Sequence, residues 1–141
     1  MSDSPVIKSE SIYKIFGNNA EKLLEKYQGK VDAQKFQDAG CIVGVNKASF
    51  EGYKGEMLVV MGLSGSGKST LLRCISRLTE ATSGKIFIDG EDLLKMNSKE
   101  LIDLRRNKMG MVFQSFALLP HKTVVENIAF PLQIKGIKTN D

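Results

Sequence analysis

The sequence contains no tryptophan, a single histidine, two cysteines and three prolines among its 141 residues. Cys41 and Cys74 lie far apart and in no metal-binding or redox spacing, so we expect two reduced thiols. No apolar run approaches the roughly 20 residues that a membrane-spanning helix needs. The N-terminal stretch MSDSP lacks the charged and then apolar layout of a signal peptide, so no leader is expected. The pattern therefore predicts neither a disulfide-stapled fold nor a membrane span.

The charge and composition are those of an ordinary globular protein. Charged residues make up 26% of the chain, hydrophobic residues make up 42%, and the formal net charge is +4 at pH 7. A chain of this length can form one domain with a sizeable core. A modest positive charge is usually a solvated surface, although it also suits an anionic nucleotide. No basic block with interleaved aromatic residues occurs, so we expect no nucleic-acid partner.

One glycine-rich motif points to phosphate binding. The stretch GLSGSGKST over residues 62–70 fits the pattern G-x-x-x-x-G-K-[ST] at every fixed position. Glycines let backbone N–H groups turn inward around phosphate oxygens, Lys68 can place its charge on the β- and γ-phosphates, and the Ser69 hydroxyl can ligate Mg²⁺. The alternative is a glycine-rich turn that matches by accident. The predicted ATP phosphate-binding residues are Gly62, Leu63, Ser64, Gly65, Ser66, Gly67, Lys68, Ser69 and Thr70.

The flanks of the motif favour the phosphate loop over the accidental turn. The apolar run MLVVM over 57–61 is typical of a parallel strand that is buried on both faces. After the loop, apolar residues recur at helical spacing at Leu71, Leu72, Ile75 and Leu78. The sequence therefore predicts a strand, a phosphate loop and a helix over 57–78, which is the context that the motif requires.

Before the motif, the pattern predicts strands on either side of a charged segment. A first strand is expected over 6–16, and Gly17-Asn18-Asn19 breaks it. Residues 20–36 have a partly helical pattern that Gly29 weakens. Further strand is expected over 41–45 and 47–50.

After the motif, turn and capping signals mark the elements. A strand over 85–88 is followed by the strong turn signal Asp89-Gly90. Asn97 with Glu100 resembles a capping box that opens a helix to about Arg106. Another strand is expected over 109–113. Thr123 with Glu126 is a second capping box, and Pro131 is expected to bend the helix it starts or to end it early.

Two further stretches complete a family pattern. The sequence VFQ over 112–114 comes after the phosphate loop and is followed by LPHKTV over 119–124. This combination resembles the nucleotide-binding subunits of ABC transporters, in which the glutamine ends a strand as the Q-loop. The resemblance is closer still to the ATP-binding subunits of glycine betaine/proline betaine importers, which take up quaternary amines. That closer resemblance rests on IYKIFG over 12–17, the charged insertion over 17–40, and the stretches MGLSGSGKST and MVFQSFALLPH.

The resemblance implies a fold and a division of the chain. The fold is α/β, a P-loop NTPase of the ABC nucleotide-binding type, and the chain is expected to end after the Q-loop helix. Residues 1–141 would be the N-terminal part of an ABC ATPase domain. Within it, 17–40 is the insertion of the family, 57–78 is the phosphate-loop unit and 109–130 is the Q-loop region.

The resemblance also implies roles for two residues outside the loop. Phe16 would stack on adenine, a contact that contributes about 1–3 kcal/mol per base; the alternative is an aromatic residue at a strand end that faces the core. Gln114 would reach Mg²⁺ and the attacking water and would act with Lys68 in catalysis. Its alternative is an amide at a strand end with no special role. Mg²⁺ would therefore be held by Ser69 and Gln114.

Partners and location follow from the same resemblance. Phe116 to Ile128 are candidates for contact with the permease subunits in the membrane; the alternative is that Leu118, Leu119 and Val124 simply pack into the domain. A second ATP-binding subunit is expected, and a substrate-binding protein indirectly. The subunit would lie peripherally on the cytoplasmic face of the inner (plasma) membrane.

Hydrolysis needs residues that the resemblance does not find in this chain. The signature motif, the Walker B Asp, the catalytic Glu and the switch His of the family have no counterpart here. The stretch IFID over 86–89 is followed by Gly90 and predicts a hairpin turn, and His121 belongs to the LPHK stretch. We therefore expect the N-terminal portion of a subunit that hydrolyses ATP for quaternary-amine import, inactive by itself. The alternative is a truncated fragment that binds ATP without hydrolysing it.

Overall fold

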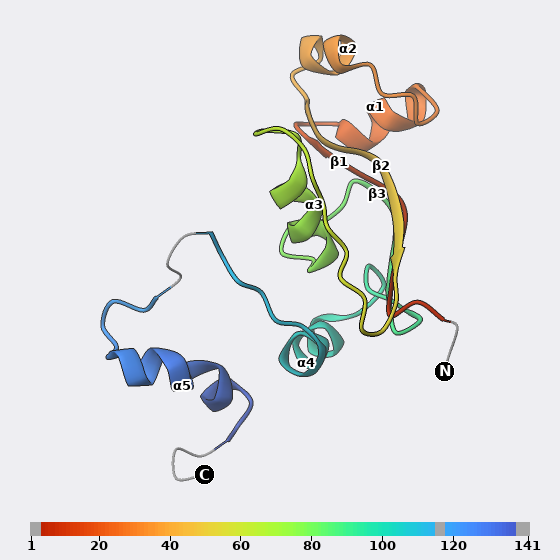
Figure 1. Ribbon diagram of the computed structural model, residues 1–141. Coiled ribbons are helices and arrows are strands. Elements are labelled where there is room, and N and C mark those ends of the chain that lie inside the picture. The colour runs from red at the N-terminus through yellow and green to blue at the C-terminus, as the bar shows by residue number, and fades with distance from the viewer. Residues whose placement is uncertain (1–3, 115–117, 138–141) are drawn as a thin grey trace. The chain divides into compact units, whose positions relative to one another are not determined.

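The computed structural model describes residues 4–114 and 118–137 and forms two compact units, Met1–Met96 and Asn97–Asp141 (Figure 1). The units are described in turn. No helix within the described ranges is long and apolar enough to cross a membrane.

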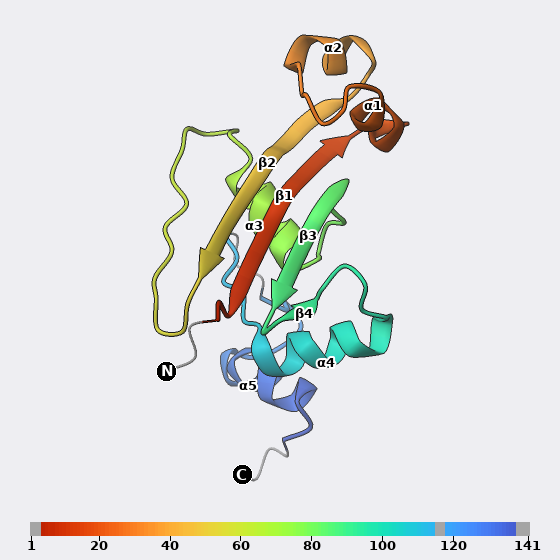
Figure 2. The same ribbon diagram turned by 90° about the vertical axis from the view of Figure 1, so that its right-hand side faces the viewer.

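The first unit is built on a four-stranded antiparallel sheet with the order β2-β1-β3-β4 (Figure 2). Its strands are β1 (Ile7–Phe16), β2 (Ile42–Gly52), β3 (Ser83–Ile88) and β4 (Glu91–Asp92). The strands predicted over 6–16 and 85–88 are confirmed, and those predicted over 41–45 and 47–50 form one continuous strand. Asp89 and Gly90 both have positive φ, 49° and 83°, which is the geometry of a two-residue hairpin turn and confirms the turn signal.

Helix α3 (Lys68–Ile75) lies against one face of this sheet and contacts β1 and β2 (Figures 1 and 2). Its buried residues are Leu71, which belongs to the predicted apolar face, and Cys74, which comes directly before Ile75 of that face. The helix ends at Ile75, before Leu78, because Arg77 adopts a left-handed φ of 53°. The Arg77 Nη1 atom then donates to the carbonyls of Leu93 at 3.0 Å and Met96 at 2.7 Å, which holds the end of the phosphate-loop unit to the end of the sheet.

Residues 17–40, the predicted insertion, form two short helices, α1 (Ala20–Lys26) and α2 (Ala33–Asp38), at one end of the sheet (Figures 1 and 2). Phe36 is fully buried among residues of β1 and α1. Between the helices the Tyr13 hydroxyl donates to the carbonyl of Gly29 at 3.0 Å. Gly29 has a φ of 74°, so this glycine does interrupt the helical pattern, as the sequence indicated.

The second unit contains α4 (Ser98–Lys108) and α5 (Val124–Ile134). Both predicted capping boxes are present, Asn97 with Glu100 and Thr123 with Glu126. Of the two alternatives for Pro131, the early end of the helix is wrong, because α5 continues to Ile134, and the bend stays a prediction. Proline itself lacks an N–H donor, but its carbonyl accepts from the N–H of the C-cap residue Lys135 at 3.3 Å, which closes the last turn of the helix.

Two predicted strands do not form. The segments 57–61 and 109–113 are extended chain without regular structure, and several of their apolar side chains are exposed: Met57 at 87%, Val59 at 66%, Met61 at 84% and Val112 at 99%. A strand exists only when a neighbour pairs with its N–H and C=O groups. Within the part of the chain that the structure describes, neither segment has such a neighbour. The prediction of a buried strand over 57–61 and of a strand over 109–113 is therefore wrong for the described chain.

Candidate phosphate-loop site

The phosphate loop closes on its own lysine. The Lys68 Nζ atom donates to the carbonyl of Gly62 at 2.7 Å and to that of Leu63 at 2.6 Å, and it lies 3.4 Å from the Ser66 Oγ atom. The ammonium is therefore held over the loop by neutral carbonyl oxygens. Phosphate oxygens are stronger, charged acceptors for the same donors, so an anion that enters the loop can replace these contacts.

Helix α3 begins directly at the loop. Gly67 is its N-cap residue and has a φ of 91°, a conformation that favours glycine. Ser69 and Thr70 lie in the first turn, where backbone N–H groups without helical partners point along the positive end of the helix dipole. Further along α3, the Cys74 side chain lies on the buried face of the helix. Burial raises the pKa of its thiol and so makes it unreactive.

The backbone of β2 meets the loop at Gly44. A Cβ atom added to Gly67 would overlap the carbonyl oxygen of Gly44. The N-cap of α3 and the beginning of β2 are therefore in closest contact, and only a residue without a side chain fits on the helix side. A small cavity of about 180 Å³ opens beside this contact. Its lining is Gly44, Val45, Asn46, Ala48, Val60, Met61, Ser66, Gly67, Lys68 and Leu71.

The structure also brings the Phe16 ring to this place. Phe16 ends β1, pairs with Ile42 of β2 and is 44% exposed. A Cβ atom added to Gly44 would lie 2.8 Å from Phe16 Cε2 and 3.1 Å from Thr70 Cγ2. The ring and the first turn of α3 thus border the same point of the β2 backbone. Sequence reasoning named Phe16 and Thr70, but it missed Gly44, which no motif marks.

A second residue that sequence reasoning missed is Lys14. Its Nζ atom lies 4.9 Å from the centroid of the Phe16 ring, a cation–π contact. A base that stacks on this ring must take the opposite face or displace the ammonium. Lys14 comes before Phe16 with an alternating spacing that is ordinary in a strand, so the sequence carries no signal for this contact.

Gln114 lies in the second unit, whereas Lys68 lies in the first. Its side chain is exposed and its backbone forms a bend after the extended segment 109–113. The expected strand end is therefore absent at this residue, and the Mg²⁺ site that Ser69 and Gln114 would share stays a prediction. Phe116, which begins the predicted partner region, lies outside the described residues.

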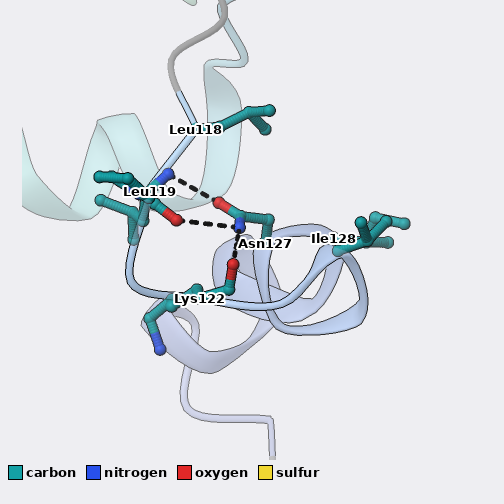
Figure 3. A pocket seen from close by; sticks show the side chains of 7 residues that line it. Leu118, Leu119, Lys122, Asn127 and Ile128 are labelled. Carbon is teal, nitrogen blue, oxygen red and sulfur yellow. Dashed lines mark hydrogen bonds between the residues drawn. The ribbon is translucent and has the colours of Figure 1, made fainter.

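The rest of the predicted partner region forms an apolar pocket of about 280 Å³ (Figure 3). Leu118 and Val124 are 64% and 76% exposed, so they do not simply pack into a core. One amide holds the wall of the pocket: Asn127 Oδ1 accepts from the Leu119 N–H at 2.8 Å, and Nδ2 lies within 3.2 Å of the carbonyls of Leu119, Lys122 and Thr123. The pocket is lined by Leu118, Leu119, Pro120, Lys122, Val124, Asn127 and Ile128.

The loop that closes on Lys68 and opens helix α3 defines the fold class, a P-loop NTPase with the ABC ATPase cassette fold. The chain belongs to the ABC transporter family, whose family model matches residues 45–141. It is similar to a solved dimeric bacterial ABC transporter cassette, MJ0796, with a TM-score of 0.72 and 32% identity over 92% of this chain and 47% of that one. A second structure of MJ0796, bound to ADP and Pi, aligns with a TM-score of 0.70 and 31% identity.

Among known sequences, the chain is similar to ATP-binding proteins of particular transport systems. The chain is 82% identical over its whole length to the trimethylamine N-oxide transport system ATP-binding protein TmoW of Pelagibacter ubique, and it covers 41% of that protein. It is 44% identical over 96% of its length to the glycine betaine/proline betaine transport system ATP-binding protein ProV of Escherichia coli, of which it covers 34%. The chain therefore spans less than half the length of these relatives.

If the contact between Gly67 and Gly44 positions the phosphate loop, a side chain at Gly67 should weaken the binding of Mg-ATP. Gly67→Ala places a methyl group onto the Gly44 carbonyl, which forces the loop away from β2. We expect the affinity for Mg-ATP to fall about tenfold or more, measured by isothermal titration calorimetry.

Gly55→Ala is the matched control. Gly55 has a similar positive φ of 81°, but an added Cβ would meet nothing within 4 Å. Its backbone strain is comparable, and its effect on the affinity should stay below about twofold. Equal losses in both variants would show that strain, and not the contact with β2, decides the affinity.

Proposed function

We propose that the chain acts as the ATP-binding part of an ABC importer for trimethylamine N-oxide or a related quaternary amine such as glycine betaine. The phosphate loop supports the nucleotide-binding part of this proposal. The Lys68 ammonium lies over the loop and donates to two carbonyl oxygens, which phosphate oxygens can replace as acceptors. The 82% identity with a trimethylamine N-oxide system, against 44% with a glycine betaine system, favours the first solute.

In this proposal Mg-ATP is bound by residues of the loop and of helix α3, together with Gln114 of the second unit. Lys68 would exchange its contacts with two carbonyls for the β- and γ-phosphates. The Ser69 hydroxyl in the first turn of α3 would ligate Mg²⁺, and the Gln114 amide would be a further oxygen ligand and would orient water. Mg²⁺, when bound, neutralises charge on the phosphates during transfer of the γ-phosphoryl group. Phe16 would stack on the adenine.

Hydrolysis of ATP is part of the proposal for the whole protein. A second candidate is binding of ATP without hydrolysis by this chain. The composition of the cavity beside Lys68 favours it, because the described lining offers an ammonium, hydroxyl and amide groups but no carboxylate that could serve as a general base. Measured turnover separates the two candidates.

The partners would be those of an import system. We propose two permease subunits, a second ATP-binding subunit and, indirectly, a substrate-binding protein, with the chain on the cytoplasmic face of the plasma membrane. The names of the relatives as ATP-binding proteins of transport systems support this assembly, and so does the dimeric state of the MJ0796 cassette. The apolar pocket over 118–128 is the proposed contact with a permease, because its open wall presents Leu118, Val124 and Ile128.

Replacing the lysine tests the nucleotide-binding part of the proposal. In Lys68→Ala the loop loses its only described ammonium contact, so the affinity of the full-length protein for Mg-ATP should fall about tenfold or more. Uptake of trimethylamine N-oxide by the assembled transporter in proteoliposomes should fall with it. Lys54→Ala, which changes an exposed lysine of the preceding turn, is the control for the lost charge. An unchanged affinity in Lys68→Ala would remove the phosphate-loop assignment.

A pair of neighbouring valines tests the partner surface. Val124 and Val125 are 76% and 74% exposed in the first turn of α5, but only Val124 lines the pocket. A carboxylate at either position meets the same helix dipole, so effects on folding should match. Val124→Asp should weaken the association with the permease subunits about fivefold or more, measured by co-purification in detergent, with ATP affinity retained. Equal association of the Val125→Asp and Val124→Asp proteins would contradict a contact through this pocket.

A further inference from the structure

Gly44 occupies an unusual place in the sheet. In the register of β1 and β2, Lys14 pairs with Val45 and Ile15 pairs with Val43, so Gly44 is the extra residue of a β-bulge. Bulges bend a strand locally and redirect the side chains and backbone groups beside them. This bulge lies where β2 meets both the end of β1 and the start of α3.

Space, and not backbone conformation, demands a glycine there. The φ of Gly44 is outside the left-handed region in which only glycine is comfortable. A Cβ atom at this position would instead lie 2.8 Å from Phe16 Cε2, 3.1 Å from Thr70 Cγ2 and 3.4 Å from the Lys14 carbonyl oxygen. The first of these contacts is too close for any real side chain. Phe16 is half-exposed, so its ring is the group that can give way.

We propose that Gly44 is a positioning residue for the nucleotide base. Because it has no side chain, the Phe16 ring can lie beside Thr70, and the Gly44 carbonyl can lie against Gly67 on the other side of the same residue. The bulge thereby sets the separation between the aromatic ring and the phosphate loop, which one nucleotide must span. The inference rests on the proposed binding of ATP, and it adds a residue that touches neither base nor phosphate.

In a test on the full-length protein, two ligands distinguish the contribution of the Phe16 ring to binding from that of the phosphate loop. Mg-ATP needs both groups, whereas inorganic tripolyphosphate needs the loop alone. In Gly44→Ala the new methyl group displaces the Phe16 ring. We expect the dissociation constant for Mg-ATP to rise about fivefold or more, while that for tripolyphosphate changes less than twofold. A purely structural role of Gly44 would weaken both ligands equally, and that result would overturn the proposal.

Gly52→Ala is the matched control within the same strand. A Cβ atom at Gly52 would lie 2.8 Å from Ile7 Cγ2, which equals the shortest contact at Gly44, but the site is remote from the loop in the sheet register. Its affinities for both ligands should equal those of the unsubstituted protein. A loss of Mg-ATP affinity in Gly52→Ala equal to that in Gly44→Ala would show that crowding anywhere in β2 suffices, which contradicts a local effect on Phe16.

A double variant keeps the test decisive if Gly44→Ala folds poorly. Phe16→Ala removes the ring that the new methyl group strikes, so adding Gly44→Ala to it should cause no further loss of Mg-ATP affinity and should restore folding. A further loss, or a failure to fold, would overturn the proposal. Failure of ATP binding itself is distinguishable, because the unsubstituted protein would then bind neither Mg-ATP nor tripolyphosphate.

Discussion

The contact between the β2 backbone at Gly44 and the start of α3 at Gly67 is the constraint on which the site depends. It places the phosphate loop, whose Lys68 ammonium rests on the carbonyls of Gly62 and Leu63, against the antiparallel sheet. The same contact puts the loop beside Phe16 at the end of β1. Residues that are far apart in the sequence therefore surround one short stretch of β2. In the proposed binding of ATP, the loop would supply the charge for phosphate and the sheet would supply the aromatic surface for a base.

In the second unit, one side chain holds the turn before α5 in place through hydrogen bonds to the backbone. The Asn127 side chain bonds to the backbone of Leu119 and Lys122 (Figure 3) and also to that of Thr123, and so it fixes the turn that precedes α5. The capping box of Thr123 and Glu126 closes the same turn from the other side. The hydrogen bonds from Thr123 lower the pKa of the Glu126 carboxyl, so it stays ionised to a lower pH than an unpaired Glu carboxyl. A rigid turn of this kind can present apolar side chains to a partner at a low entropic cost.

Local signals in the sequence predicted much of this arrangement. The spacing of Gly62, Gly67 and Lys68 predicted the phosphate loop, and both capping boxes and the Asp89-Gly90 turn formed as expected. These features depend on neighbouring residues alone. The strands over 57–61 and 109–113 depend on partners elsewhere in the chain, and the apolar pattern cannot supply them. The roles of Gly44 and Asn127 could not be predicted for a related reason. Both depend on contacts with residues elsewhere in the chain, which only folding brings close.

In the closed loop, the carbonyl oxygens of Gly62 and Leu63 accept the hydrogen bonds of Lys68 that phosphate oxygens would accept when ATP is bound. A crystal structure of the full-length protein with Mg²⁺ and a slowly hydrolysed ATP analogue tests this exchange directly. We expect the Lys68 Nζ atom to leave the carbonyls of Gly62 and Leu63 and to contact the β- and γ-phosphates, with the adenine on the Phe16 ring. Nucleotide bound elsewhere, with Lys68 still on the two carbonyls, would contradict the account.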